Sequence, residues 1–161
     1  MGHIEEVTEE LRKIPWFQEL SEDHIKKIAS LSKVCSIKAG ESLFREGDKQ
    51  DSVYIVLQGR VGLEMFVPHH GKVRFYTAEM WEIFGWSSVT PNIRQRTAGA
   101  VAVVDSTVLC AEADALYRAC DEDHDLGYLV MRRLANVVAA RLLVTRLQLL
   151  DMFANPETKN V

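Results

Sequence analysis

The chain has 161 residues, 47% of them hydrophobic, and carries a formal net charge of −4 at pH 7. This length is sufficient for one domain with its own core and too short for two domains of ordinary size. The negative charge excludes a general basic surface of the kind that binds nucleic acids, so any such binding would depend on local basic clusters.

Helices are expected at the N-terminus, from about residue 4 to residue 31. Ser21 is placed to cap the second of them, and Glu22 and Asp23 would lie beside the positive end of the helix dipole. The spacing of the apolar residues changes at Lys33, where short runs of alternating apolar residues begin.

Short strands separated by turns are expected between about residues 33 and 112. Within residues 52–57 the side chains of Val53, Ile55 and Leu57 share one face, and within residues 60–66 those of Val61, Leu63 and Met65 do. Further strands are expected at residues 72–77 and 106–111. The turn signals between them are four glycines, Gly40, Gly47, Gly59 and Gly71. Such a pattern is typical of an antiparallel roll or barrel.

Helix returns from about residue 113 to residue 153. The expected fold is therefore of the α+β class: an antiparallel, jelly-roll-like β-roll with N-terminal helices and a long C-terminal dimerisation helix, forming one domain over residues 1–161.

The segment from Phe84 to Ala102 has the residue types that an anion pocket needs. Gly85 permits a close approach of backbone N–H groups to a ligand, and Ser87 and Ser88 suit the first turn of a short helix, whose free N–H groups attract phosphate. Arg96, followed by Thr97, would supply a matching charged fork, with Arg94 as a weaker substitute.

This segment resembles the phosphate-binding cassette of the cyclic nucleotide-binding domains found in the Crp/Fnr-like, catabolite-activator family. The interval from Gly85 to Arg96 matches the family's glycine-to-arginine interval without a gap, and the resemblance extends over about residues 16–153. Two positions depart from the pattern. Trp86 replaces the glutamate that, in the family, accepts a hydrogen bond from the ribose, and Trp81–Glu82 replace a Gly-Asp turn.

Trp86 has two interpretations. Its ring would stack on a purine or a ribose and restore part of the missing contact, or it is an apolar side chain of the core or of the pocket rim. Loss of a hydrogen bond to a charged group costs about 1.5–3 kcal/mol, or roughly one to two decades of affinity.

Residues 125–151 contain no proline and are expected to form one long helix. Its second half carries leucine and valine around the entire circumference, so it must be covered on more than one side, most economically by the same helix of a second copy. Four arginines in this region argue against a membrane span.

Arg141, Thr145 and Gln148 fall close together on this helix, among apolar neighbours. The run from Ala140 to Thr145 resembles the family's Arg-Arg-Leu-Gln-Val-Thr, which implies that Arg141 and Thr145 cap the ligand. Alternatively, the three polar residues form a layer that sets the register of a dimeric coiled coil. The resemblance thus implies nine ligand-contact residues: Phe84, Gly85, Trp86, Ser87, Ser88, Arg96, Thr97, Arg141 and Thr145.

The favoured function is that of a non-enzymatic ligand sensor. It would bind cyclic AMP, another cyclic nucleotide or a related small anion, need no cofactor, and signal through a helical homodimer to an effector of unknown identity. The chain has no helix-turn-helix after the long helix, so we expect no DNA binding by this chain alone; it would then be a regulator without such a module or a fragment of a longer transcription regulator.

Other classes of function remain open. The pocket would be degenerate if the tryptophans fill it, leaving a dimeric interaction module. A cupin-like metal enzyme would need more ligands than His69 and His70 supply. The three cysteines have no metal-ligand spacing and are interpreted as small apolar side chains in a reducing cytoplasm, and neither a signal peptide nor a catalytic motif is found.

Overall fold

The computed structural model describes residues 2–49, 51–89 and 95–155. Three helical segments open the chain: α1 (His3–Lys13), the 3-10 helix η1 (Pro15–Glu19) and α2 (Glu22–Ser30). Pro15 ends the first helix and begins η1, where its missing N–H costs no hydrogen bond. The cap predicted at Ser21 is confirmed, because its hydroxyl accepts a hydrogen bond from the His24 amide at 3.2 Å.

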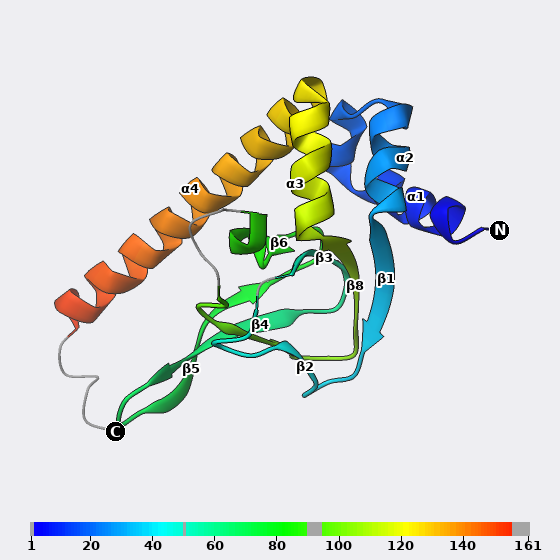
Figure 1. Cartoon of the computed structure of the whole chain (residues 1–161). Coiled ribbons are helices and arrows are strands. Elements are labelled where there is room, and N and C mark those ends of the chain that lie inside the picture. Colours follow the sequence, from blue (N-terminus) through cyan, green and yellow to red (C-terminus); the bar gives the residue numbers. More distant parts are fainter. Residues whose placement is uncertain (1, 50, 90–94, 156–161) are drawn as a thin grey trace.

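The described strands form two four-stranded antiparallel sheets, in the orders β1-β8-β3-β6 and β2-β7-β4-β5, that enclose the roll (Figure 1). The predicted antiparallel β-roll is therefore confirmed. The strands are β1 (Ser32–Ile37), β2 (Ser42–Phe44), β3 (Ser52–Gln58), β4 (Val61–Val67), β5 (Gly71–Ala78), β6 (Ile83–Phe84), β7 (Gly99–Ala102) and β8 (Ser106–Glu112).

Strand β3 separates two apolar clusters. Val53 and Ile55 share one face, as predicted, and pack into a cluster with the helices, whereas Tyr54 and Val56 pack into the interior of the roll. The alternation in the sequence did not indicate that the second face is buried as well. Because the helices cover the outside of this sheet, both faces are removed from water.

A β-bulge interrupts the long hairpin of β4 and β5. Leu63 pairs with Tyr76 and the next residue, Glu64, pairs with Arg74, so Phe75 has no partner in the ladder. Val61 and Leu63 share one face, as predicted, and both pack into the cluster of the roll interior, whereas Met65, predicted on the same face, does not. Met65 is 41% exposed, because the neighbouring strand β7 begins at Gly99, opposite Glu64, and does not reach Met65.

Two helices follow the roll, α3 (Ala113–Glu122) and α4 (His124–Ala154), and the second contains the long helix predicted for residues 125–151. At about 1.5 Å per residue, its 31 residues extend over about 46 Å. Its first half packs into the helical layer, and its second half passes over the roll toward the side of the β4–β5 hairpin (Figure 1). Within the described ranges, none of the helices has an apolar stretch long enough to cross a bilayer.

Candidate functional site

A cavity of about 350 Å³ lies between the roll and α4. This volume is at the lower end of the range for small-molecule pockets. Strands and the segment after β6 form one wall, and α4 forms the other. The lining residues are Phe44, Leu63, Phe75, Tyr76, Gly85, Trp86, Ser87, Arg96, Thr97, Ala98, Val138, Arg141, Leu142, Val144, Thr145 and Gln148.

Gly85 forms the turn between β6 and the 3-10 helix η2 (Trp86–Val89). Its φ of +67° lies in the left-handed region that glycine adopts without strain. The missing side chain also makes room for a neighbour, because a Cβ at this position would lie 2.8 Å from Nη1 of Arg96. The glycine is thus needed for its conformation and for its small size.

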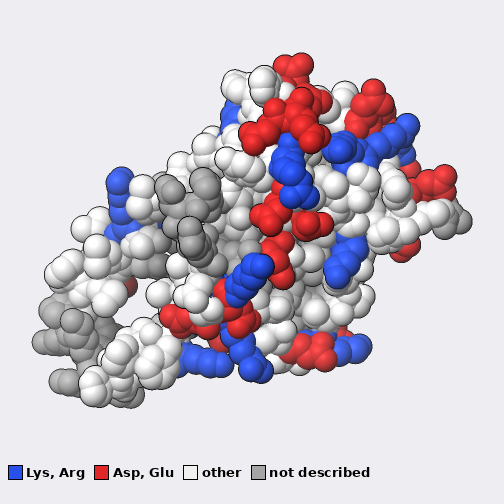
Figure 2. All heavy atoms as spheres, viewed as in Figure 1, with Lys and Arg blue, Asp and Glu red and all other residues white. Residues whose placement is uncertain are grey.

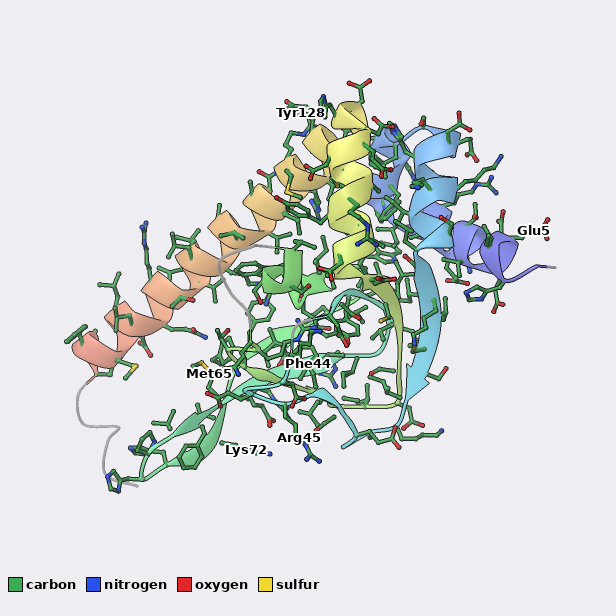
Figure 3. The ribbon with its side chains drawn as sticks, in the orientation of Figure 1. Glu5, Phe44, Arg45, Met65, Lys72 and Tyr128 are labelled. Carbon is green, nitrogen blue, oxygen red and sulfur yellow. The ribbon has the colours of Figure 1, made fainter. Side chains whose placement is uncertain are left out.

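Arg96 is buried beside this turn, with only 3% of its surface exposed. Its Nη1 donates to the Gly85 carbonyl at 3.1 Å and its Nη2 to the Ser52 carbonyl at 2.6 Å. The guanidinium carbon lies 4.0 Å from the centre of the Phe44 ring, which points from β2 into the roll, whereas Arg45 points away on the other side (Figure 3). Arg96 is therefore not an exposed surface side chain.

One donor of Arg96 has no acceptor. Its Nε is buried and has no hydrogen-bond partner in the described part of the chain, and the nearest carboxylate oxygen, on Asp51, lies 3.9 Å from Nη2. Burial is the main cause of a lowered pKa for this guanidinium. A buried cation with a free N–H beside a cavity is suited to binding an anion.

The other residues predicted from the cassette lie in different places. Ser87 and Thr97 line the cavity. The Ser88 hydroxyl instead donates toward the carbonyl oxygens of Ser52 and Gly85, at 2.9 and 2.8 Å, and the Phe84 ring is fully buried and stacks on a tyrosine within the roll. Neither of these two side chains lines the cavity, and Arg94 lies outside the described residues.

Trp86 has one face on the cavity and another against the helical core cluster. The ring therefore presents apolar surface at the position where the resemblance implies a carboxylate. The second departure also has a structural effect, because Trp81 adopts a φ of +68° in the turn where the resemblance implies a glycine. Left-handed conformations are uncommon for residues with a bulky side chain.

Arg141 reaches from α4 to the roll. Its Nη2 donates to the Ile83 carbonyl at 3.1 Å, and its guanidinium carbon lies 3.2 Å from the centre of the Tyr76 ring. The Tyr76 hydroxyl donates to Oε1 of Glu82 at 2.6 Å, and this oxygen is 4.0 Å from Arg141. Burial, followed by the bond to Glu82, raises the pKa of Tyr76 to about 12.

Thr145 and Gln148 face the same roll. The Thr145 hydroxyl donates to the Arg141 carbonyl in the preceding turn at 2.9 Å. Nε2 of Gln148 donates at 3.0 Å to the carbonyl of Phe75, the bulged residue that has no ladder partner. The three polar residues that the sequence grouped together on the helix therefore point toward the cavity side of this chain's own roll.

Sequence reasoning missed the contribution of the strands to the cavity. Phe44, Phe75 and Tyr76 line it, yet their alternation indicates only that they belong to strands. Nothing in the local pattern shows which apolar residues of a roll face a cavity and which fill the core. In the described ranges, no three His, Cys, Asp or Glu residues lie close enough together to hold a metal ion.

The sequence pattern of the family named "Cyclic nucleotide-binding domain" matches residues 34–123, more than half of the chain. The chain belongs to this family. It is similar in structure to a cyclic nucleotide-binding domain from Methylobacillus flagellatus KT, with 25% identity and a TM-score of 0.76; the match covers 92% of this chain and 83% of that one.

Two further solved structures are similar to the present chain. The catabolite activator protein of Thermus thermophilus is 25% identical with a TM-score of 0.69, and the match covers 87% of this chain and 63% of that protein. The regulatory domain of Toxoplasma gondii PKA, crystallised with cAMP, has 18% identity and a TM-score of 0.68, covering 83% of this chain and 50% of that one; at this identity the likeness concerns the fold alone.

Proposed function

We propose that this domain is a non-enzymatic sensor that binds a small anion, with a cyclic nucleotide as the first candidate, in the cavity between the roll and α4. The observation that carries the proposal is Arg96, a buried guanidinium with one unsatisfied N–H that lies beside the glycine turn and on the cavity wall. Family membership supports a regulatory role, and we infer a cytoplasmic location from the sequence.

A cyclic nucleotide would be held at three places. Its phosphate would meet Arg96 and the turn at Gly85 and Ser87, Trp86 would stack on the ribose or the purine, and Arg141 with Thr145 would cover the other end. Within the lining residues there is no carboxylate, so the two arginines make the wall positive and favour an anionic ligand.

Ligand binding and the position of α4 are coupled, because this helix supplies one wall of the cavity. Its contacts with the roll include the bonds from Arg141 and Gln148 to strand carbonyls. A ligand that displaces either side chain would change how the second half of α4 lies on the roll. We infer that occupancy is transmitted to a partner or effector in this way.

The partner of α4 is proposed to be a second copy of this chain, through residues 125–151. The second half of the helix exposes Leu143, Leu147 and Leu150, each at 57% or more. On the face that Figure 2 shows, the visible surface over this part of α4 and the hairpin carries few charged side chains. Exposed apolar surface of this kind marks an interaction site.

A second candidate is an interaction module that binds no ligand. Two observations favour it: Arg96 already donates to two carbonyls of its own chain, and the Trp86 ring occupies part of the cavity wall. In that case the fold and the dimer would be retained while the pocket stays empty.

Calorimetric titration of the ligand-free protein with cyclic AMP, cyclic GMP and cyclic dinucleotides tests the proposal. We expect micromolar or tighter binding to at least one of them, weakened at least tenfold by Arg96→Lys, which keeps the charge but loses the fork. Arg60→Ala, outside the cavity, is the matched control. Absence of heat with every nucleotide would favour the interaction module, and equal binding by the Arg96 variant would refute the assigned role.

A further inference from the structure

A second, smaller hollow of about 170 Å³ lies where η1 meets the first half of α4. It is lined by Trp16, Glu19, Leu129, Arg132, Arg133 and Asn136, and it shares none of these residues with the larger cavity. The reasons to expect a ligand in this hollow therefore do not rest on the proposed function of that cavity.

Two of the residues that line this hollow carry buried N–H donors without an acceptor. Nε1 of Trp16 and Nε of Arg133 have no hydrogen-bond partner among residues 2–49, 51–89 and 95–155. The two side chains lie against each other, with the guanidinium carbon 5.1 Å from the centre of the indole ring. A buried donor without an acceptor destabilises a fold, so each of these two N–H groups indicates a missing acceptor.

The charges around the hollow leave one cation uncompensated. Nη2 of Arg132 lies 2.5 Å from Oε2 of Glu19, so these two charges are paired. Arg133 has no carboxylate within ion-pair distance in the described part of the chain. A water molecule would satisfy a donor but leave this charge without a counterpart, whereas a monoanion would satisfy both.

We propose that this hollow binds a small carboxylate. Such a group has two oxygens in one plane, which suits the paired N–H groups along one edge of the Arg133 guanidinium, and it has spare lone pairs for the indole N–H of Trp16. Its single charge matches the one cation that remains. The volume of the hollow is several times the roughly 10–15 Å³ that one water molecule needs by the same measure, so it accepts more than a single solvent molecule.

The indole N–H resonance of Trp16 provides a direct test by nuclear magnetic resonance. The full chain is titrated with sodium acetate, replacing sodium chloride at constant ionic strength, and the signal is assigned by Trp16→Phe. We expect a saturable shift of this resonance with millimolar affinity, while the signals of Trp81 and Trp86 stay in place. Arg133→Gln should abolish the shift, and Arg133→Lys should weaken binding at least tenfold.

The control is Arg146→Gln, on the same helix but exposed and outside the hollow, which should bind acetate as the parent does. Phosphate, titrated in the same way, should bind more weakly because its second charge has no partner. The proposal is overturned if no selective shift occurs, if Arg133→Gln retains it, or if phosphate binds more tightly than acetate.

Discussion

Replacing Gly85 by alanine perturbs both properties that this position requires. The φ of +67° costs an L-residue about 1–2 kcal/mol. The added Cβ would also lie 2.8 Å from Nη1 of Arg96, with Tyr54 and the Ser52 carbonyl at 3.1 and 3.3 Å. The end of an arginine can normally move aside, but this one is buried and bonded to two carbonyls.

Moving Nη1 away weakens its bond to the Gly85 carbonyl, for which we take about 1.5 kcal/mol, the lower bound for a hydrogen bond to a charged group. Gly85→Ala should therefore destabilise the fold by about 2.5–3.5 kcal/mol. Gly47→Ala is the matched control, because Gly47 has a φ of +88° with open space around its Cβ position, and should cost only about 1–2 kcal/mol.

Urea unfolding, followed by circular dichroism, measures both free energies. The difference between the two variants reports the crowding around the added Cβ at position 85, and it should shrink when both are made in an Arg96→Lys background, where only the contacts with Tyr54 and Ser52 remain. If the two alanine variants agree within about 0.5 kcal/mol in the parent protein, the reasoning about the packed arginine is refuted.

Three further outcomes are expected. Trp86→Glu should raise the ratio of the affinity for cyclic AMP to the affinity for its 2′-deoxy analogue by one to two decades in calorimetry, since the carboxylate regains a bond of about 1.5–3 kcal/mol to the ribose hydroxyl. If this ratio is near one in both proteins, position 86 does not contact the ribose. Because the pKa of Tyr76 is raised from 10.0 to about 12, its contribution to stability is complete below about pH 10 and is lost toward pH 12, so the free energy of unfolding should fall less steeply across that range in Tyr76→Phe. The double variant Leu147→Glu/Leu150→Glu should sediment as a monomer where the parent is a dimer, whereas Tyr117→Glu, at an exposed position on α3, should not change the assembly; a monomeric parent would contradict the dimer proposal.

The sequence predicted the parts of the fold that local chemistry determines. Turn glycines and two-residue alternation indicated the strands of the roll, and the absence of proline from residues 125–151 indicated one long helix. The turn at Gly85 was also predictable from the sequence, because a left-handed glycine and a short helical turn are properties of a few adjacent residues.

The partners of these residues were not predictable, because they come from distant segments. Arg96 bonds the Ser52 carbonyl at the start of β3, and Gln148 reaches a carbonyl that is free only because β5 has a bulge at Phe75. No pattern within β5 indicated this irregularity. The grouping of Tyr76 and Glu82 around Arg141 was likewise not predictable, because it depends on how α4 packs on the hairpin.

The burial of both faces of β3 has a consequence for how the molecule comes apart. A slip of one residue in this strand would move Val53 and Ile55 into the roll and Tyr54 and Val56 toward the helices, so two cores would be mispacked at once. Separation of the helices from β3 would expose Val53 and Ile55, and separation of the two sheets would expose Tyr54 and Val56. The central strand makes the two layers one cooperative unit, and heat or denaturant should melt them in a single transition.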